Sequence, residues 1–521
     1  MAQPAETAIL IGTADGVREV RSQMLLRELD GQPMPWPCGC VLTETDTPAA
    51  RDPGLPVLGE LADLPELLAW HAFSTAIVAL PARQHRDAAE ARRLLEPLGV
   101  TIRQIPLMAD LLVDGAARNT GPAGRAMDIA SLIGREPFPI DQAELESLLG
   151  TKRVLITGAG GSIGSEIAMI AARFAPERLI LVERAENALF EIDRRLREAH
   201  PSLERTSILH DVVDADGTRA YLDEHRPHVV FHAAAHKHVP LMEDHPAHAV
   251  TNNLFGTKSI ADAAVAAGAE RFVLISSDKA VNPTSVMGAT KRLAERYIQG
   301  LQRSTPGTRF SMVRFGNVLA SACSVLPIWG SQLAEGRPIT VTDERMTRYF
   351  MTIPEAASLV IQSAAVDHDG RSARVFVLDM GEPVRIVDLA ERFCRAHGYE
   401  PRRVCSSDGA AAGDIVLTGA RPGEKLYEEL AYSAELLAPT GRPGINAWAA
   451  GDTEPADTTA LIADLTSVRA SRDRDMVLAM IRRHVPEMKT DSEMSTRPGQ
   501  QPRPAESPRA GSPSDKHEIA A

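Results

Sequence analysis

The chain of 521 residues is poor in cysteine and aromatic residues and has no long apolar stretch. Its five cysteines are scattered and odd in number, so their spacing favours neither a disulfide framework nor a zinc site. We expect reduced thiols at Cys38, Cys40, Cys323, Cys394 and Cys405, and no bound metal. No apolar run approaches the length of a membrane span, and the opening MAQPAETAILIG lacks the pattern of a signal peptide. These absences predict a cytoplasmic protein.

Positive charge is also in deficit. The chain has 56 Lys and Arg against 69 Asp and Glu, which gives a formal net charge of -13. A nucleic-acid-binding protein normally presents a basic face, so that class is disfavoured. Apolar residues make up 44% of the chain, which is enough for sizeable cores, and the length predicts two or three domains.

The order of segments predicts an α/β protein built on a Rossmann-like, doubly wound parallel sheet. In residues 1–135, strand-like segments such as TAILIG and TAIVALP alternate with helical ones, which is typical of a helix-covered parallel sheet. Residues 136–150 are predicted to be a linker, 151–440 a cofactor-binding domain with a small substrate-binding subdomain, and 441–485 a C-terminal helical segment. The tail 486–521 is rich in Pro, Ser and charge and is predicted to be disordered.

A glycine-rich loop opens the second domain. VLITGAGGSIGSE places Gly158, Gly161 and Gly164 between an apolar strand and an apolar-periodic helix, with Ser162 and Ile163 at the helix start. A pyrophosphate must approach backbone N–H groups at a helix N-terminus, and larger side chains would hold it away. The loop therefore predicts a dinucleotide site.

Residues after the next strands complete this predicted site. Glu183 ends the strand RLILVE and can bind the ribose hydroxyls, which favours NAD over NADP, although the adjacent Arg184 leaves NADP open. Asp211 and Val212 follow the third strand, where we expect the adenine. Small residues after the fourth strand give the cofactor room to pass, namely Ala233, Ala234 and Ala235.

The N-terminal domain carries a degenerate version of this fingerprint. Its loop GTADGV keeps Gly12 but has Ala14 and Val17 at the later glycine positions, and Val17 would crowd the contact between helix and strand. A structural or regulatory role is favoured over cofactor binding.

Seven further segments occur in order: TGAGGSIGSE, HAAAHKHVPLME, TNNLFGT, SSDKAVNPTSVMGATKRLAE, RFGNVLAS, TRYFMTIPEA and RPGEKLYEEL. Together they resemble the extended short-chain dehydrogenase/reductase domain of CapD-like polysaccharide biosynthesis proteins, a family that contains UDP-N-acetylglucosamine 4,6-dehydratases. The resemblance is close over about residues 130–440. This chain departs from the longer relatives of the family in two ways. They have membrane helices ahead of the first domain, and they have a glycine where this chain has Cys323.

The resemblance implies a nucleotide-sugar 4,6-dehydratase that uses NAD and a UDP-sugar. Such an enzyme oxidises carbon 4 of the sugar, removes a proton from carbon 5, expels the oxygen on carbon 6 as water and returns the hydride there. Most relatives carry a tyrosine four residues before a lysine that lowers its pKa. Lys291 is present and is expected also to contact the cofactor, but Met287 occupies the tyrosine position and cannot transfer a proton.

Three residues after the strand RFVLIS are the expected substitutes. Ligands bind beyond the carboxyl ends of parallel strands, so Ser277, Asp278 and Lys279 should face the sugar. Asp278 suits the elimination acid if burial raises its pKa, and Lys279 suits the carbon 5 base if Lys291 and NAD lower its pKa. Ser277 can bind the carbon 4 oxygen. A Met-type subgroup of the family has this Asp-Lys pair, which implies a working enzyme that retains the configuration at carbon 5.

Substrate contacts are expected from five further residues: His236, Lys237, Asn317, Arg348 and Arg421. The arginine fork suits a diphosphate, although surface salt bridges are the competing interpretation of both arginines. A homo-oligomer is expected for this fold. Two other functions stay open, a UDP-sugar 4-epimerase and an inactive nucleotide-sugar-binding protein.

Overall fold

The computed structural model describes residues 7–14, 16–18, 20–21, 24, 36–43, 55–71, 73–80, 85–104, 138, 141–366, 374–397, 399–404, 406, 410–432, 437–448 and 457–489. The predicted disordered tail lies outside these residues from position 490 onward, as does Cys405. The four described cysteines are free thiols.

The N-terminal segment forms a parallel five-stranded sheet. Its strands, in spatial order, are β3 (Val57–Gly59), β2 (Trp36–Leu42), β1 (Thr7–Gly12), β4 (Thr75–Ala79) and β5 (Thr101–Gln104). Helices α2 (Leu64–His71) and α3 (His85–Leu95) follow β3 and β4. Val17 is fully buried against Ala8 and Leu10 of β1, so this side chain fills the space that a third fingerprint glycine would leave open. The predicted lack of dinucleotide binding here stays a prediction.

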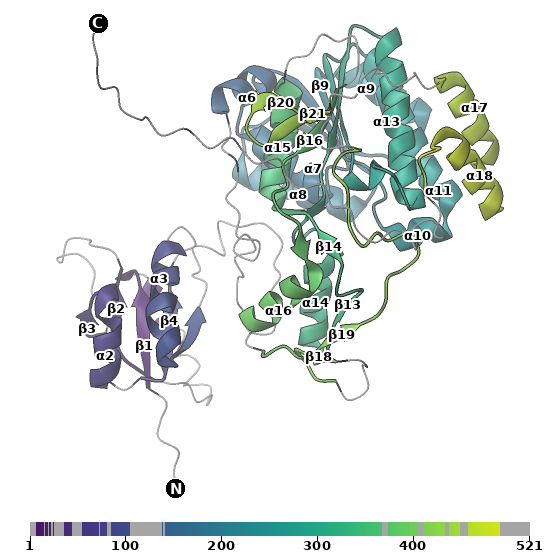
Figure 1. The fold of residues 1–521 in the computed structure, drawn as a ribbon. Helices are drawn as coiled ribbons and strands as arrows, with labels where there is room; N and C mark the ends of the chain where they lie inside the picture. Colours follow the sequence, from purple (N-terminus) through teal and green to yellow (C-terminus); the bar gives the residue numbers. More distant parts are fainter. Residues whose placement is uncertain are drawn as a thin grey trace, which may run out of the picture. The chain divides into compact units, whose positions relative to one another are not determined.

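A nine-stranded sheet forms the centre of the second unit (Figure 1). Its strands, in spatial order, are β20 (Leu437–Arg442), β21 (Ile445–Trp448), β16 (Arg374–Leu378), β11 (Arg309–Arg314), β10 (Arg271–Ile275), β9 (Val229–His232), β6 (Arg153–Thr157), β7 (Arg178–Glu183) and β8 (Arg205–Leu209). The strands from β16 to β8 are parallel, whereas β20 and β21 add an antiparallel edge. Strand order reverses between β6 and β9, which is where ligands bind in such sheets.

Helices cover both faces of this sheet because its strands bury alternate residues on opposite sides. Leu155 of β6 packs into one apolar cluster, and its neighbours Val154 and Ile156 pack into the other. The first cluster is covered by α9 (Ala215–His225), α10 (Val239–Asp244), α11 (Pro246–Val250), the π-helix η4 (Thr251–Phe255), α12 (Gly256–Ala266), α13 (Val286–Ser304), α17 (Thr458–Val468) and α18 (Arg474–His484). The second is covered by α6 (Gln142–Leu149), α7 (Ser162–Ala172), α8 (Glu186–Ala199) and α15 (Ile353–Ala365).

A small sheet gathers segments inserted between these strands. It consists of β13 (Ile339–Val341), β19 (Ile415–Leu417) and β18 (Arg403–Val404), with helices α14 (Val325–Ala334) and α16 (Ile386–Ala396). Trp329 of α14 and Phe393 of α16 pack with ring centroids 5.5 Å apart. Four short strands remain, namely β12 (Asn317–Val318), β14 (Thr347–Arg348), β15 (Phe350–Met351) and β17 (Val384–Arg385).

Three boundaries differ from those the sequence predicts. Helix α6 lies within the predicted linker 136–150 and buries Leu145 and Leu149 in the second apolar cluster, the one that contains Val154 and Ile156. The pair β20 and β21 crosses the predicted boundary at 440, so a strand stands where a helical segment is expected. Residues 486–489 of the expected tail are ordered, because Met488 is buried and the Lys489 amide donates a hydrogen bond to the Pro283 carbonyl at 2.9 Å.

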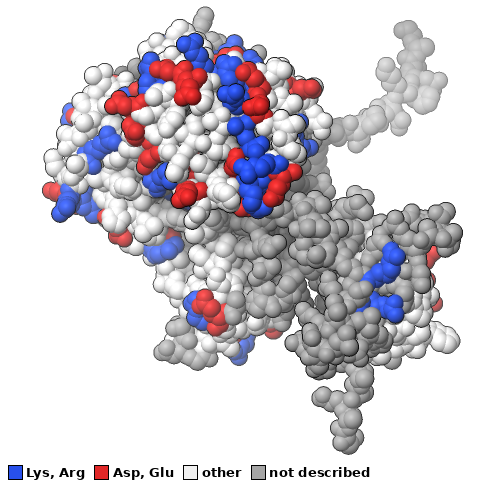
Figure 2. Space-filling view, turned by 180° about the vertical axis from the view of Figure 1, so that it is seen from behind, with Lys and Arg blue, Asp and Glu red and all other residues white. Residues whose placement is uncertain are grey.

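The surface of the large unit mixes both signs of charge. On the face shown in Figure 2, basic and acidic side chains are interspersed, with no broad basic area among the described residues of that view. Within the described ranges, no helix is both long enough and apolar enough to cross a bilayer.

Candidate functional site

The glycine loop follows β6 and has the close packing that a dinucleotide needs. Gly158 has φ of +63°, and a Cβ there would lie 2.7 Å from the Ala234 amide nitrogen. A Cβ on Gly164 would lie 2.1 Å from the Gly158 carbonyl oxygen. Gly161 is the N-cap of α7, and Ser162 and Ile163 form its first turn. The loop thus presents backbone rather than side chains at this helix N-terminus.

The other predicted cofactor residues surround this loop. The Glu183 carboxylate accepts hydrogen bonds from the Gly160 amide at 3.2 Å and the Arg184 amide at 2.9 Å. The Arg184 guanidinium lies 3.6 Å from the Asp211 carboxylate. Val212 is buried, and Ala233, Ala234 and Ala235 continue directly from β9. These residues come from the carboxyl ends of β7, β8 and β9, so the chain fits a dinucleotide lying across the sheet.

The buried His232, which the sequence reasoning missed, holds the strand end before the glycine loop against α12. Its ring nitrogens face the hydroxyls of Thr157 at 2.7 Å and Thr257 at 3.0 Å. Thr257 donates its own proton to the Asn253 carbonyl at 2.6 Å, so it must accept from His232 Nε2. Burial lowers the pKa of His232 to about 3, with Lys291 acting in the same direction. His232 is therefore a neutral tether between β6 and α12.

The end of β10 places the predicted acid in the protein interior. Ser277 Oγ donates to Asp278 Oδ1 at 2.8 Å, and Asp278 is fully buried. Its second oxygen, Oδ2, is buried without a hydrogen-bond partner. Burial raises the pKa of the Asp278 carboxyl, and although Lys279 opposes this, the net direction is upward. The rise agrees with the condition expected for an elimination acid.

Lys279 is surrounded by oxygen atoms rather than by other cations. Its Nζ lies 3.1 Å from Asp278 Oδ1, 3.2 Å from Asn317 Oδ1 and 3.3 Å from Glu428 Oε1. Burial alone lowers the Lys279 pKa, but Asp278 and Glu428 raise it, and the net shift is upward. The lowering expected from Lys291 and bound NAD stays a prediction, and without the cofactor the two carboxylates raise this pKa instead.

Met287 and Lys291 lie in the first turns of α13, whose N-cap is Ser285. Met287 is 3% exposed and packs into the first of the two apolar clusters, the one that contains Leu155. Lys291 Nζ donates to the Ile275 carbonyl at 2.7 Å, and burial lowers its pKa to about 8 although Glu295 opposes the shift. The lysine is thus present and buried, and the position four residues before it on α13 carries a thioether in place of a phenol.

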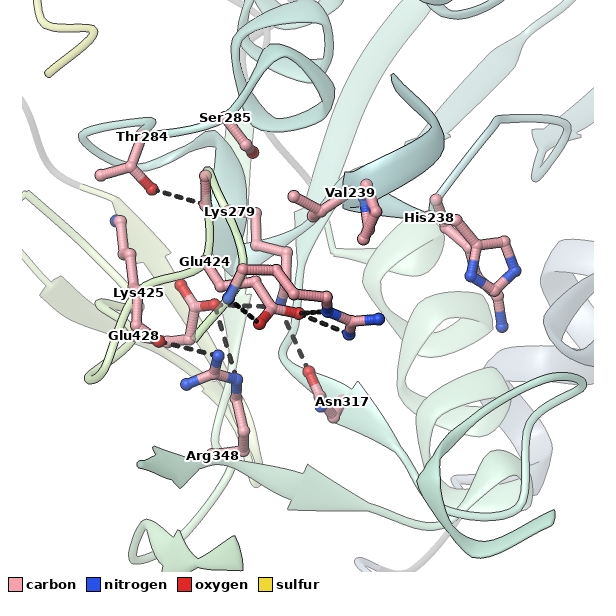
Figure 3. A pocket seen from close by; sticks show the side chains of 14 residues that line it. His238, Val239, Lys279, Thr284, Ser285, Asn317, Arg348, Glu424, Lys425 and Glu428 are labelled. Carbon is pink, nitrogen blue, oxygen red and sulfur yellow. Dashed lines mark hydrogen bonds and ion pairs between the residues drawn. The ribbon is translucent and has the colours of Figure 1, made fainter. Parts of the chain in front are cut away.

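A cavity of about 190 Å³ lies next to this cluster (Figure 3). Five cationic and two anionic side chains are among those that line it, namely Lys237, Lys279, Arg348, Arg421, Lys425, Glu424 and Glu428. Asn317 and His238 also contribute. The cavity thus contains Lys237, Lys279, Asn317, Arg348 and Arg421 from the predicted set. Ser277, Asp278, Met287, Lys291 and His236 are not in its wall.

Glu428 is the functional candidate that the sequence reasoning did not single out. Its side chain is 2% exposed, and its Oε1 lies 3.3 Å from Lys279 Nζ and 3.7 Å from Arg348 Nε. Its Oε2 is buried without a hydrogen-bond partner. Burial alone raises the Glu428 pKa, but Lys279, Arg348 and Lys425 lower it, and the net shift is downward. The motif RPGEKLYEEL contains this residue, yet nothing in it distinguishes Glu428 from the 40% exposed Glu429.

The remaining predicted substrate ligands have protein partners. Arg348 donates to the carbonyls of Thr347 and Lys425, both at 2.8 Å, and so holds the 421–428 segment. Arg421 pairs with Glu424 at 2.6 Å and is 58% exposed. His236 lies outside the cavity, where its Nε2 is 3.0 Å from that of His248, and burial lowers its pKa to about 4. UDP binding by the two arginines stays a prediction.

No group of three metal-ligating side chains converges among the described residues. The arrangement instead provides a glycine loop at a helix N-terminus, a cavity rich in cations, and a buried lysine between two carboxylates. Such a cluster can hold and release protons beside a bound sugar.

Residues 154–448 match the family described as polysaccharide biosynthesis protein. The capsular polysaccharide biosynthesis protein CapD of Staphylococcus aureus is 41% identical over 73% of this chain and 61% of CapD. The probable polysaccharide biosynthesis protein EpsC of Bacillus subtilis is 41% identical over 83% of this chain and 69% of EpsC. The chain therefore spans less than two thirds of CapD. The X-ray structure of Pen from Bacillus thuringiensis matches with a TM-score of 0.50 and 30% identity, over 57% of this chain and 88% of Pen.

Two more distant relatives have reactions in their names. A UDP-glucose 4-epimerase of Rickettsia canadensis is 31% identical over 55% of this chain and 79% of its own length. A UDP-N-acetylglucosamine 4,6-dehydratase (inverting) of Campylobacter jejuni is 28% identical over 54% of this chain and 78% of its own length.

Proposed function

Because the chain belongs to the polysaccharide biosynthesis protein family, we propose that it is an NAD-dependent nucleotide-sugar 4,6-dehydratase. The proposed reaction converts UDP-N-acetylglucosamine into UDP-4-keto-6-deoxy-N-acetylglucosamine, a precursor for surface polysaccharide. The observation that carries the proposal is the cluster of Asp278, Lys279 and Glu428 at the cavity, because an elimination needs both an acid and a base.

The dinucleotide would be held by residues of the glycine loop and by Glu183. When bound, NAD supplies the oxidation of carbon 4 and the later reduction of carbon 6. Arg184 is paired with Asp211 and also donates to Asn252 Oδ1 at 3.3 Å, so protein groups already engage its guanidinium at the end of β7. Glu183 adds a negative charge there, and both features favour NAD over NADP.

Lys279 is the proposed donor of the proton that leaves with the carbon 6 oxygen. It lines the cavity, and its raised pKa keeps it protonated. Asp278 lies 3.1 Å behind it and can return the proton, since burial raises the Asp278 pKa toward a protonated carboxyl. Ser277 donates to Asp278 and is not in the cavity wall, so its contact with the carbon 4 oxygen stays a prediction. From the sequence, Asp278 itself is expected to protonate the departing oxygen. We assign that step to Lys279 instead, because Asp278 is not in the cavity wall.

A UDP-sugar 4-epimerase is the second candidate, since a relative with that name is 31% identical. Met287 weakens this candidate, because the thioether cannot exchange a proton with the carbon 4 hydroxyl. The acid–base cluster would also have no task in an epimerisation.

Mass spectrometry of UDP-N-acetylglucosamine after incubation with the protein and NAD tests the proposal. A dehydratase forms a product lighter by one water, with no accumulation of reduced cofactor. Replacing Lys279 with Ala should lower the rate by about 10²- to 10⁴-fold. An isobaric product that separates on chromatography would favour the epimerase, and an unchanged sugar with intact binding would favour a nucleotide-sugar-binding protein.

A further inference from the structure

The cavity wall contains the carboxylate of Glu428, one oxygen of which has no hydrogen-bond partner. Glu428 is 2% exposed, and its Oε1 satisfies Lys279 while Oε2 is left without a hydrogen-bond partner. An unsatisfied buried carboxylate oxygen costs free energy, so it is expected to have a use. Figure 3 shows Glu428 and Lys279 side by side in the cavity wall.

We propose that Glu428 is the base that removes the carbon 5 proton, with Lys279 acting as the acid of the elimination. This inference rests on the proposed dehydratase function and assigns the base of the same site. The assignment differs from the one expected from the sequence, in which Asp278 is the acid and Lys279 is the base.

The proton steps balance over the whole cycle. The carbon 5–hydrogen bond of the 4-keto sugar breaks, and the proton joins Glu428 Oε2 while the electron pair passes to the carbon 4 oxygen. As the carbon 6–oxygen bond then breaks, that pair forms the carbon 5–carbon 6 double bond, and the proton of Lys279 joins the departing oxygen to give water. When carbon 6 is then reduced, Glu428 returns its proton to carbon 5. The carbon 4 hydroxyl loses one proton on oxidation, and one proton restores Lys279 through Asp278, which lies 3.1 Å away, so the cycle neither gains nor loses a proton.

The surrounding charges favour this division of roles over the reverse. Lys279 lies 3.1 Å from the Asp278 carboxylate and 3.3 Å from the Glu428 carboxylate, and although Arg348 opposes them, they raise the Lys279 pKa, so Lys279 is held as an ammonium and cannot accept a proton. Glu428 faces Lys279, Arg348 and Lys425, and the three cations keep it ionised. A carboxylate held ionised is a weak base in water, but a ketone next to carbon 5 makes that proton acidic, and positioning supplies the rest.

Glu428 could instead serve only to hold Lys279 and Arg348 in place. These two roles differ in one measurable step, the exchange of the carbon 5 proton with solvent. A positioning role for Glu428 would leave Lys279 to remove that proton, so exchange would survive loss of the Glu428 carboxylate.

The test follows UDP-N-acetylglucosamine in D₂O with full-length variants and NAD. Proton NMR of the recovered sugar nucleotide measures deuterium at carbon 5, and mass spectrometry of the same sample measures the dehydrated product. Glu428→Gln should lose carbon 5 exchange by about 10²-fold or more, whereas Glu428→Asp should restore part of it. Lys279→Gln should lose product formation more than exchange.

Glu429→Gln is the matched control, since it makes the same chemical change at the neighbouring, 40% exposed carboxylate outside the cavity wall. Exchange in Glu428→Gln within tenfold of Glu429→Gln would overturn the assignment, as would exchange that is lost in Lys279→Gln and kept in Glu428→Gln. Wild-type protein that forms no dehydrated product would instead refute the proposed function, so the two failures are distinct.

Discussion

Replacing Glu295 with Gln should destabilise the large unit strongly. Glu295 of α13 is fully buried and accepts hydrogen bonds from Arg314 Nε at 2.7 Å, Arg314 Nη2 at 2.5 Å and Ser276 Oγ at 2.7 Å. Because Arg314 is also fully buried, a neutral side chain at position 295 leaves an unpaired guanidinium in the core. Breaking one partner of such a pair costs about 3–5 kcal/mol of unfolding free energy.

The lowered pKa of Glu295 gives a second figure for its contribution to the unfolding free energy. Burial alone raises the Glu295 pKa, but Arg314 and Arg292 lower it, and the net result is a pKa of about 2 against an ordinary value of 4.5. The difference corresponds to about 3 kcal/mol at neutral pH. Since the folded pKa lies below the unfolded one, this stability is present above about pH 4.5 and is lost as the pH falls toward 2.

Urea unfolding followed by circular dichroism at pH 7 measures the effect. Glu191→Gln, which removes an exposed carboxylate paired with Arg194, is the matched control and should leave the unfolding free energy almost unchanged. The reasoning is refuted if Glu295→Gln unfolds at the same urea concentration as this control, because the buried pair would then contribute nothing.

Three further outcomes follow from the same structure. Gly164→Ala should abolish NAD binding measured by calorimetry, because the new Cβ would lie 2.1 Å from the Gly158 carbonyl oxygen. Gly330→Ala in α14 is the control and should bind NAD normally, because a Cβ there has no neighbouring atom within 4 Å. Lys291→Met should raise the unfolding free energy at pH 7 by about 2 kcal/mol. Burial lowers the Lys291 pKa from 10.5 to about 8, so below about pH 8 the buried ammonium costs the folded state about 3 kcal/mol, and loss of its hydrogen bond to the Ile275 carbonyl offsets about 1 kcal/mol of the gain; a loss of stability would contradict this. Cys323→Gly should stabilise the protein by about 1 kcal/mol, since Cys323 has φ of +56°, a conformation that glycine adopts without strain; an unchanged melting temperature would count against it.

Local spacing was sufficient to predict the strand, glycine loop and helix at residues 153–172. Gly158 and Gly164 stand between an apolar strand and an apolar-periodic helix, and only one common arrangement satisfies that pattern. Helix α6 could also have been found, because Asp141 caps it by accepting from the Glu144 amide and its leucines follow helical spacing. The two prolines nearby favoured a linker instead.

The charges of the site could not be predicted in the same way. The pKa of Lys279 depends on Glu428, a residue distant in sequence that the turn after Arg421 brings to the cavity. Two adjacent glutamates in the sequence cannot show which one faces inward. The pair of Glu295 and Arg314 was missed for a similar reason, since it joins a helix to a strand that only the sheet topology places together.

The fate of a deuterium label at carbon 4 of UDP-N-acetylglucosamine tests the central claim most directly. A dehydratase transfers that hydrogen within one active site, so the label should appear in the new carbon 6 methyl group of a product that has lost water. Recovery of the label at carbon 4 in a sugar of unchanged mass would contradict the account.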